Sequence, residues 1–301
     1  MNPTPGALPL AVSADLIHID TPAGRVALYR AGPDGPASDL PPIVLLHSVN
    51  AAASVAEVAP LFAHYRTTRT VVALDLPGYG HSDRADRLYT PRLMTDALKA
   101  VVDWTCAQTG VQKVDVLGVS LSAEFVARAQ SEMPARIRRI ALVSPTGFSR
   151  RKRRHGPPGT TLMLPWLYRL LTRPGWGERI FRNLTRPGVI RYFLKRTFGD
   201  KAIDEALWRY AVITTRQPGA RHAPLCFVSA ALFSADINTL YESLTCRVWV
   251  SMATRGDFTR YTQRQLLEGR DHWQFLAIEG GAMPYFEDLQ AFTGRLDPFW
   301  R

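Results

Sequence analysis

Two kinds of hydrophobic pattern alternate along the first half of the chain. The first is a short, nearly continuous apolar run, which is typical of a strand covered on both faces. Runs of this kind occupy residues 43–46, 70–74, 114–117 and 140–143. The second is a longer segment with helical spacing of its apolar residues, seen at 52–65, 91–109 and 121–133. Strand and helix therefore alternate, and we expect a mostly parallel sheet with right-handed crossovers.

The two ends of the chain complete this sheet. Residues 16–20 and 25–29 flank a turn at Thr21-Pro22-Ala23-Gly24, which predicts an antiparallel pair of strands. Residues 247–252 and 274–278 repeat the strand pattern, and a helix from about residue 284 to 300 closes the chain. The fold class predicted is therefore α/β, with a mostly parallel, eight-stranded twisted sheet and helices on both faces.

The alternation stops after the sixth strand. Residues 150–244 have the pattern of helices broken by Pro174, Pro187 and Pro218, which indicates an α-helical lid inserted into the fold. Residues 1–149 and 245–301 would then form one core domain around it. A chain of 301 residues with 46% hydrophobic residues is large enough to bury such a core.

A candidate nucleophile lies directly after the strand at 114–117. The segment there reads Gly118-Val119-Ser120-Leu121-Ser122 and leads into a predicted helix. A nucleophile elbow needs this order of strand, tight turn and helix, with small residues beside the strained serine. Ser120 would also lie at a helix N-terminus, where the helix dipole and unpaired N–H groups stabilise negative charge.

Two further loops resemble those of a known family. His47-Ser48-Val49-Asn50 follows the third strand, and Asp75-Leu76-Pro77-Gly78-Tyr79-Gly80-His81-Ser82 follows the fourth. Together with the elbow, these segments resemble the HG-type and DxxGxGxS segments of the α/β-hydrolase superfamily. The resemblance covers about residues 15–150 and 247–301 and leaves the lid uncovered. It implies a lidded serine hydrolase fold with Ser120 as the nucleophile.

The resemblance also implies an oxyanion hole. The backbone N–H groups of Val49 and Leu121 would hold the negative oxygen of the reaction intermediate. Ser48 and Ser122 depart from the pattern, because the family usually carries glycine at both positions. A side chain would then occupy a tightly packed loop.

The sequence offers a candidate for the triad acid but none at the expected position of the triad histidine. Asp257, just after the strand that follows the lid, is at the position of the triad acid, although Arg255 could hold it in a structural ion pair. In the family, the triad histidine follows the last strand in a Gly-His-x-Pro type segment. This chain reads Gly280-Gly281-Ala282-Met283-Pro284, so Ala282 stands where histidine is expected. Without a base, a serine hydroxyl is a poor nucleophile.

Three explanations of Ala282 remain open from the sequence. The chain is an inactivated His-to-Ala variant of an esterase-like hydrolase, it uses another base, or it is a non-catalytic protein that binds a ligand or partner. His222, where the lid returns to the core, is the alternative base that the sequence offers. No GxxxxGK, GxGxxG or HExxH pattern occurs, so we expect no metal, nucleotide or redox cofactor.

The charges indicate where partners could bind. With 37 Lys and Arg against 26 Asp and Glu, the net charge is +11, and the basic run 149–155 opens the lid. Aromatic, aliphatic and arginine residues mix at 162–171 and 190–196, a composition typical of interfacial helices. We therefore expect a lipophilic small-molecule substrate or ligand, with peripheral contact to an anionic membrane as a further hypothesis.

Other partners and compartments are less favoured. No recognisable nucleic-acid-binding module is present, so we expect no nucleic acid partner. The N-terminus lacks a charged region before its short apolar stretch, and no apolar run is long enough to span a bilayer. The cysteines are Cys106, Cys226 and Cys246, an odd and widely spaced set that favours a reducing, cytoplasmic setting.

Overall fold

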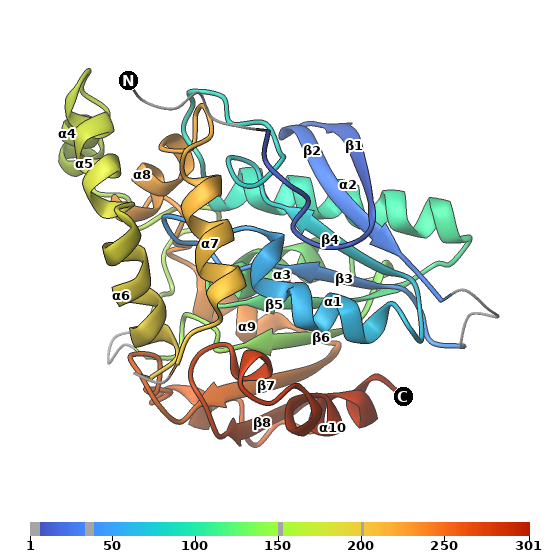
Figure 1. Cartoon of the computed structure of the whole chain (residues 1–301). Coiled ribbons are helices and arrows are strands. Elements are labelled where there is room, and N and C mark those ends of the chain that lie inside the picture. Colours follow the sequence, from blue (N-terminus) through green and yellow to red (C-terminus); the bar gives the residue numbers. More distant parts are fainter. Residues whose placement is uncertain (1–6, 34–38, 150–152, 200–201) are drawn as a thin grey trace.

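A computed structural model describes residues 7–33, 39–149, 153–199 and 202–301 (Figure 1). Within these ranges, eight strands form one sheet. They are β1 (Asp15–Thr21), β2 (Gly24–Ala31), β3 (Ile43–Leu46), β4 (Val71–Asp75), β5 (Val114–Val119), β6 (Ile137–Val143), β7 (Arg247–Ala253) and β8 (Trp273–Ile278). Their order across the sheet is β1-β2-β4-β3-β5-β6-β7-β8.

The sheet is parallel except at one edge. β1 pairs with β2 antiparallel, β2 pairs with β4 antiparallel, and every later pair from β4 to β8 is parallel. The predicted mostly parallel, eight-stranded α/β fold is confirmed. The strands from β3 onward run in the same direction. The loops that follow β3, β5, β6, β7 and β8 therefore lie together at the carboxyl ends of the strands.

Each face of the sheet has its own core because side chains alternate along a strand. In β3, Val44 and Leu46 pack on one face, and Ile43 and Leu45 pack on the other. The first face is covered by α2 (Pro91–Thr109) and α3 (Ser122–Glu132). The second is covered by α1 (Ala59–Tyr65) and α10 (Leu289–Trp300), which lie in front of the sheet in Figure 1. The elbow helix α3 therefore packs in the core of the first face, beside α2.

Between β6 and β7 the chain forms a helical insert, as predicted. Its helices in the described ranges are α4 (Pro165–Leu171), α5 (Trp176–Leu184), α6 (Pro187–Thr197), α7 (Glu205–Thr214), α8 (His222–Val228) and α9 (Ile237–Ser243). Pro174 and Pro218 lie between helices, and Pro187 begins α6. Figure 1 shows α4, α5 and α6 along one side of the molecule, with α7 nearer the sheet. The limits 150–244 for a lid stay a prediction.

Two helices begin later than the pattern suggests. The segment 52–65 is helical only from the 3-10 turn η1 (Val55–Val58) onward, because the Asn50 side chain accepts a hydrogen bond from the Ala52 amide and holds a turn there. The closing helix begins at Leu289 rather than near residue 284, because Asp288 caps it through the Ala291 amide. Local side-chain hydrogen bonds set both boundaries.

Candidate functional site

Ser120 lies in a strained turn between β5 and α3. Its φ of 55° is in the left-handed region that residues with a side chain rarely adopt. The Ser120 amide donates to the Val143 carbonyl of β6 at 2.8 Å, and its carbonyl accepts from the Ala123 amide at 3.2 Å. Gly118 allows the helix to approach, because a Cβ there would lie 2.9 Å from Val126. The turn therefore has the backbone of a nucleophile elbow.

The Ser120 side chain is half-buried and lies at the N-terminus of α3. Within the described ranges, its hydroxyl has no hydrogen-bond partner. In the same ranges, the backbone amides of Val49 and Leu121 donate to no other group of the protein. Unpaired backbone amides are the groups from which an oxyanion hole is built.

A buried carboxylate braces the loop that carries Val49. Glu57 is only 3% exposed, and it accepts from the Ser48 amide at 2.8 Å and from the Asn50 side chain at 2.6 Å. The Asn50 side chain also donates to the Ser48 hydroxyl at 3.0 Å. Ser48 is thereby built into the hydrogen bonds of the loop.

Ser122 joins the elbow to the same loop. The Ser122 hydroxyl donates to the His47 carbonyl at 2.5 Å. The His47 ring accepts from the Leu76 amide at 3.0 Å through Nε2 and donates to the Ser48 carbonyl at 2.6 Å through Nδ1. Because both ring nitrogens are engaged, His47 holds two loops together and is not available as a base.

Asp257 lies on the surface beyond β7. Its side chain is 46% exposed, and Arg196 of α6 binds both carboxylate oxygens at 2.7 and 2.8 Å. The Arg196 hydrogen bonds hold the pKa of the Asp257 carboxyl below its usual value. Arg255, which the sequence offered as the ionic partner of Asp257, pairs with Glu287 instead.

Ala282 is buried beneath the end of α6. It is 4% exposed, and its amide donates to the Thr197 carbonyl at 2.8 Å. Gly281 allows this contact, since a Cβ there would lie 2.3 Å from the Thr197 oxygen and 2.6 Å from Phe198. The helical insert therefore packs directly on the loop that follows β8.

His222 lies at the start of α8. Its Nδ1 is 3.1 Å from Asp86, in a pocket lined by Tyr168, Leu171 and Arg173. Burial lowers its pKa. All seven histidines lie within the described ranges, and none has a hydrogen bond to Ser120. Among the described residues, no group of three or more His, Cys, Asp or Glu side chains is placed to hold a metal ion.

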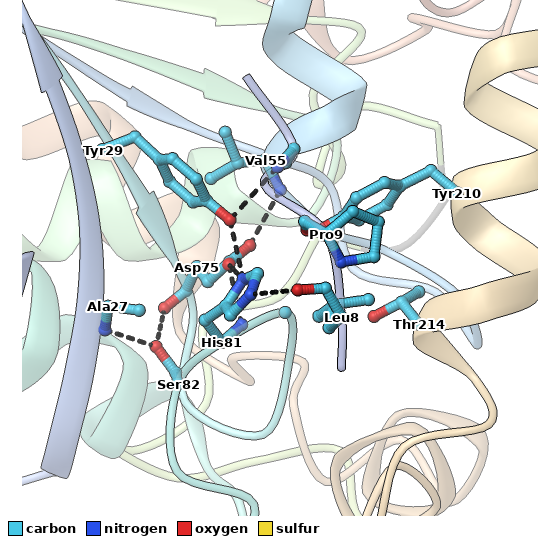
Figure 2. A network of polar contacts seen from close by, with 12 residues as sticks. Leu8, Pro9, Ala27, Tyr29, Val55, Asp75, His81, Ser82, Tyr210 and Thr214 are labelled. Carbon is cyan, nitrogen blue, oxygen red and sulfur yellow. Dashed lines mark hydrogen bonds and ion pairs between the residues drawn. The ribbon is translucent and has the colours of Figure 1, made fainter. Parts of the chain in front are cut away.

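The segment Asp75–Ser82 has a structural role that Figure 2 shows. The fully buried Asp75 accepts from the amides of Val55 and His81, both at 2.9 Å. The His81 ring bonds to the Tyr29 hydroxyl at 2.8 Å and to the Leu8 carbonyl at 3.0 Å. These bonds join the loop after β4 to β2, to η1 and to the start of the described chain.

The same network extends to the helical insert. The Tyr210 hydroxyl of α7 donates to the Pro9 carbonyl at 2.9 Å. Arg84 donates to the backbone and side chain of Thr214 at 2.9 and 3.0 Å. The N-terminal segment and the loop after β4 therefore hold α7 in place.

The chain matches the model of one known protein family. A family model described as alpha/beta hydrolase fold matches residues 41–193, just over half of the chain. The chain belongs to the alpha/beta hydrolase fold family. The match includes both loops that carry Val49 and Ser120 as well as the first helices of the insert.

Part of the chain is similar to a named protein. The protein named 1-acylglycerol-3-phosphate O-acyltransferase ABHD5 from Sus scrofa is 34% identical over 117 residues, which are 36% of this chain and 31% of that protein. The chain thus spans about a third of the length of this relative.

Among solved structures, carboxylesterase CesB from Bacillus subtilis has a TM-score of 0.66 at 18% identity, over 97% of this chain and 92% of its own. The enol-lactonase from Burkholderia xenovorans LB400 has a TM-score of 0.69 at 16% identity, over 94% and 99%. These likenesses show the fold.

Two residues that contact the candidate site were not predicted from the sequence. Glu57 lies nine positions after Ser48 and belongs to none of the motifs, and its position in η1 is held by contacts such as that of the Val55 amide with Asp75. Arg196 is one of many arginines in the insert, and nothing in its neighbours along the chain indicates a contact with Asp257. Both contacts depend on tertiary packing.

Proposed function

We propose that this site is that of a serine hydrolase for a lipophilic carboxylic ester, in which the position of the general base is taken by Ala282. The observation that carries the proposal is the elbow at Ser120, with its unpaired hydroxyl and the unpaired amides of Val49 and Leu121. The folds of the carboxylesterase and the lactonase support this reaction class by analogy. The helical insert would act as a lid that covers the acyl chain.

The reaction would follow the acyl-transfer route. The Ser120 hydroxyl attacks the ester carbonyl, and the oxygen that becomes negative is held by the amides of Val49 and Leu121. The bond from the carbonyl carbon to the alcohol then breaks, and the alcohol leaves with the proton that the serine gave up. Water hydrolyses the acyl-serine. Since no described histidine bonds to Ser120, proton removal is the slow step, and turnover by the chain with Ala282 is weak.

The first test measures the chemistry of Ser120 in the unaltered protein. The protein is exposed to a fluorophosphonate, with and without added imidazole, and its intact mass and peptide map are recorded. We expect an adduct on Ser120 that forms faster as imidazole is added, because the small base replaces the missing side chain. Ser120→Ala is the control and should give no adduct.

The second test restores the base within the fold. Ala282→His should raise kcat/KM for short and long p-nitrophenyl esters by about 10²–10⁴-fold, the usual contribution of a general base. Ala282→Gln is the matched control, since it adds a side chain of similar size that cannot take the proton. A folded Ala282→His protein with no gain, together with no imidazole effect, would refute the hydrolase proposal.

A second candidate is a non-catalytic protein that binds a ligand or partner. It is favoured by the contacts of α6, because Arg196 engages Asp257 and the Thr197 carbonyl engages the Ala282 amide. Because the insert contacts both Asp257 and Ala282, it would keep the site permanently closed. This candidate predicts no phosphonate adduct in any of the variants.

We also propose a cytoplasmic location. Cys106, Cys226 and Cys246 are all unpaired thiols, which suits a reducing compartment. No helix in the described part of the chain combines the length and apolarity that crossing a bilayer demands. Fractionation of cells that express the tagged protein would test the location.

A further inference from the structure

The outer helices of the insert expose large aromatic side chains. Trp166 of α4 is 64% exposed and Trp176 of α5 is 60% exposed. On α6, Tyr192 and Phe193 are 52% and 53% exposed. Tryptophan is seldom left this open to water without a partner. The three helices lie along the same side of the molecule in Figure 1.

Each of these helices pairs its aromatic residue with basic residues on the same side. In α4, Trp166 is followed at helical spacing by the exposed Arg169, and the exposed Arg173 lies just beyond the end of this helix. In α5, Trp176 is followed in the same way by the exposed Arg179. Residues three, four or seven positions apart share one face of a helix. In α6, the exposed residues Tyr192 and Lys195 repeat this spacing.

The charge of this surface is strongly one-sided. Between residues 165 and 197 there are eight basic residues and one acidic residue, Glu178. Glu178 is itself bound by Arg182 and Arg221. In the described ranges, the following basic side chains of this segment have no acidic partner: Arg169, Arg173, Arg179, Arg186 and Lys195. We call α4–α6 with these side chains the basic-aromatic face.

The basic run that opens the insert does not contribute in the same way. Residues 150–152 lie outside the described residues. Arg154 turns inward, where it is 9% exposed and binds the buried Glu124 at 2.9 Å. Arg153 and His155 both lie near Glu242, at 3.8 and 3.3 Å. The unpaired charge that the structure describes is therefore on α4–α6.

We propose that the basic-aromatic face docks on an anionic lipid bilayer. Indole and phenol rings favour the boundary between lipid headgroups and acyl chains, and arginine and lysine beside them attract anionic headgroups. A nucleic acid would use the same charges, but a mixture of Trp, Phe and Leu at the exposed positions suits lipid better, as Leu164 is also 43% exposed. Docking would bring the proposed ester site to its lipophilic substrates, but it does not depend on that site.

Flotation of the full-length protein with vesicles tests the proposal. The protein is mixed with vesicles of phosphatidylcholine alone and with vesicles that also contain phosphatidylserine. We expect it to float with the second kind, and to be released as salt is raised. Each basic residue near an anionic surface contributes about fivefold to binding. Arg169, Arg173 and Arg179, all changed to serine, should therefore weaken binding roughly a hundredfold.

Matched variants distinguish binding through the basic-aromatic face from nonspecific effects of charge or of exposed apolar side chains. Arg25, Lys113 and Arg295 are exposed on other elements, and changing all three to serine removes the same charge but should leave binding within about twofold. Trp166→Ser with Trp176→Ser should weaken binding by at least about tenfold. Leu88→Ser with Leu266→Ser is the apolar control. Circular dichroism and urea unfolding confirm that each variant is folded.

The outcomes are distinct. No flotation with phosphatidylserine vesicles, equal flotation with both vesicles, or equal losses in the test and control variants would overturn the proposal. Binding of a duplex oligonucleotide through the same arginines, with no vesicle binding, would overturn it in favour of nucleic acid. Phosphonate labelling of Ser120 is measured separately, so failure of docking and failure of the hydrolase proposal are distinguishable.

Discussion

Replacing Glu57 tests whether its carboxylate fixes the shape of the loop that carries Val49. In the structure, Glu57 is the acceptor for the Ser48 amide, and it shares the Asn50 side chain with the Ser48 hydroxyl. Glu57→Ala removes the only acceptor that the Ser48 amide has in the described ranges. Asn50 keeps its bond to the Ser48 hydroxyl, so one donor loses its partner fully and another loses it in part.

The size of the effect follows from these contacts. A buried donor left without a partner costs about 1–3 kcal/mol, and more when the lost acceptor is charged. We expect Glu57→Ala to lower the free energy of unfolding by about 2–4 kcal/mol. Glu57→Gln keeps one acceptor oxygen, so its loss should be about half as large. Equilibrium unfolding in urea, with the transition midpoint and slope recorded for each variant, measures both losses.

A surface glutamate provides the comparison. Glu132 binds Arg92 and Lys99, but it is 30% exposed. Its replacement by alanine should cost under about 1 kcal/mol, as usual for surface ion pairs. In parallel, phosphonate labelling of Ser120 should be slower in Glu57→Ala, because the Val49 amide is no longer held in place. A folded Glu57→Ala protein as stable as Glu132→Ala, with unchanged labelling, would refute the reasoning.

Three other predictions concern the core that supports the site. Asp115 binds Arg69 at 2.8 Å, and both side chains are fully buried. Asp115→Ala should lower the free energy of unfolding in urea by about 3–5 kcal/mol, because the buried charge of Arg69 loses this partner. A loss below about 1 kcal/mol would contradict this. The Asp75 carboxylate raises the pKa of His81 above its ordinary 6.5. The folded state therefore binds this proton more tightly, so the stability lost in His81→Gln should be greatest below about pH 6.5 and should shrink as the pH rises through the raised pKa; a pH-independent difference would argue against it. Gly80 has a φ of 49°, and a Cβ there would lie 1.9 Å from Asp75. Gly80→Ala should therefore fail to fold, or unfold at a temperature far below that of the unaltered protein. An unchanged thermal unfolding midpoint would contradict this geometry.

The fold could be predicted because its signals are local. The apolar runs mark strands that are buried on both faces, and Pro91 and Gly110 bound α2 as start and stop residues. The elbow could be recognised for the same reason, since a tight turn between β5 and α3 needs small residues in sequence order. These features depend on neighbours along the chain.

The surroundings of the site could not be predicted, because they depend on contacts between distant segments. Arg196 and Asp257 are 61 positions apart and Ala282 meets Thr197 across 85 positions, so no periodic pattern connects them. The sequence pointed to Arg255 as the partner of Asp257 because it was nearby. In the structure Glu287 competes for Arg255, and the exposed Asp257 is left to Arg196. The role of His222 as a base stays a prediction.

The attachment of α7 to the start of the chain has a mechanical consequence. Leu8 is held by His81 and Pro9 is held by Tyr210, both before the first residue of β1. Tension applied to the N-terminus would load these two hydrogen bonds before it reaches any strand of the sheet. In a pulling experiment, the first and weakest event should be the release of residues 8–9 from His81 and from Tyr210 of α7. Rupture of the β1–β2 ladder would follow at higher force, because seven residue pairs carry it together.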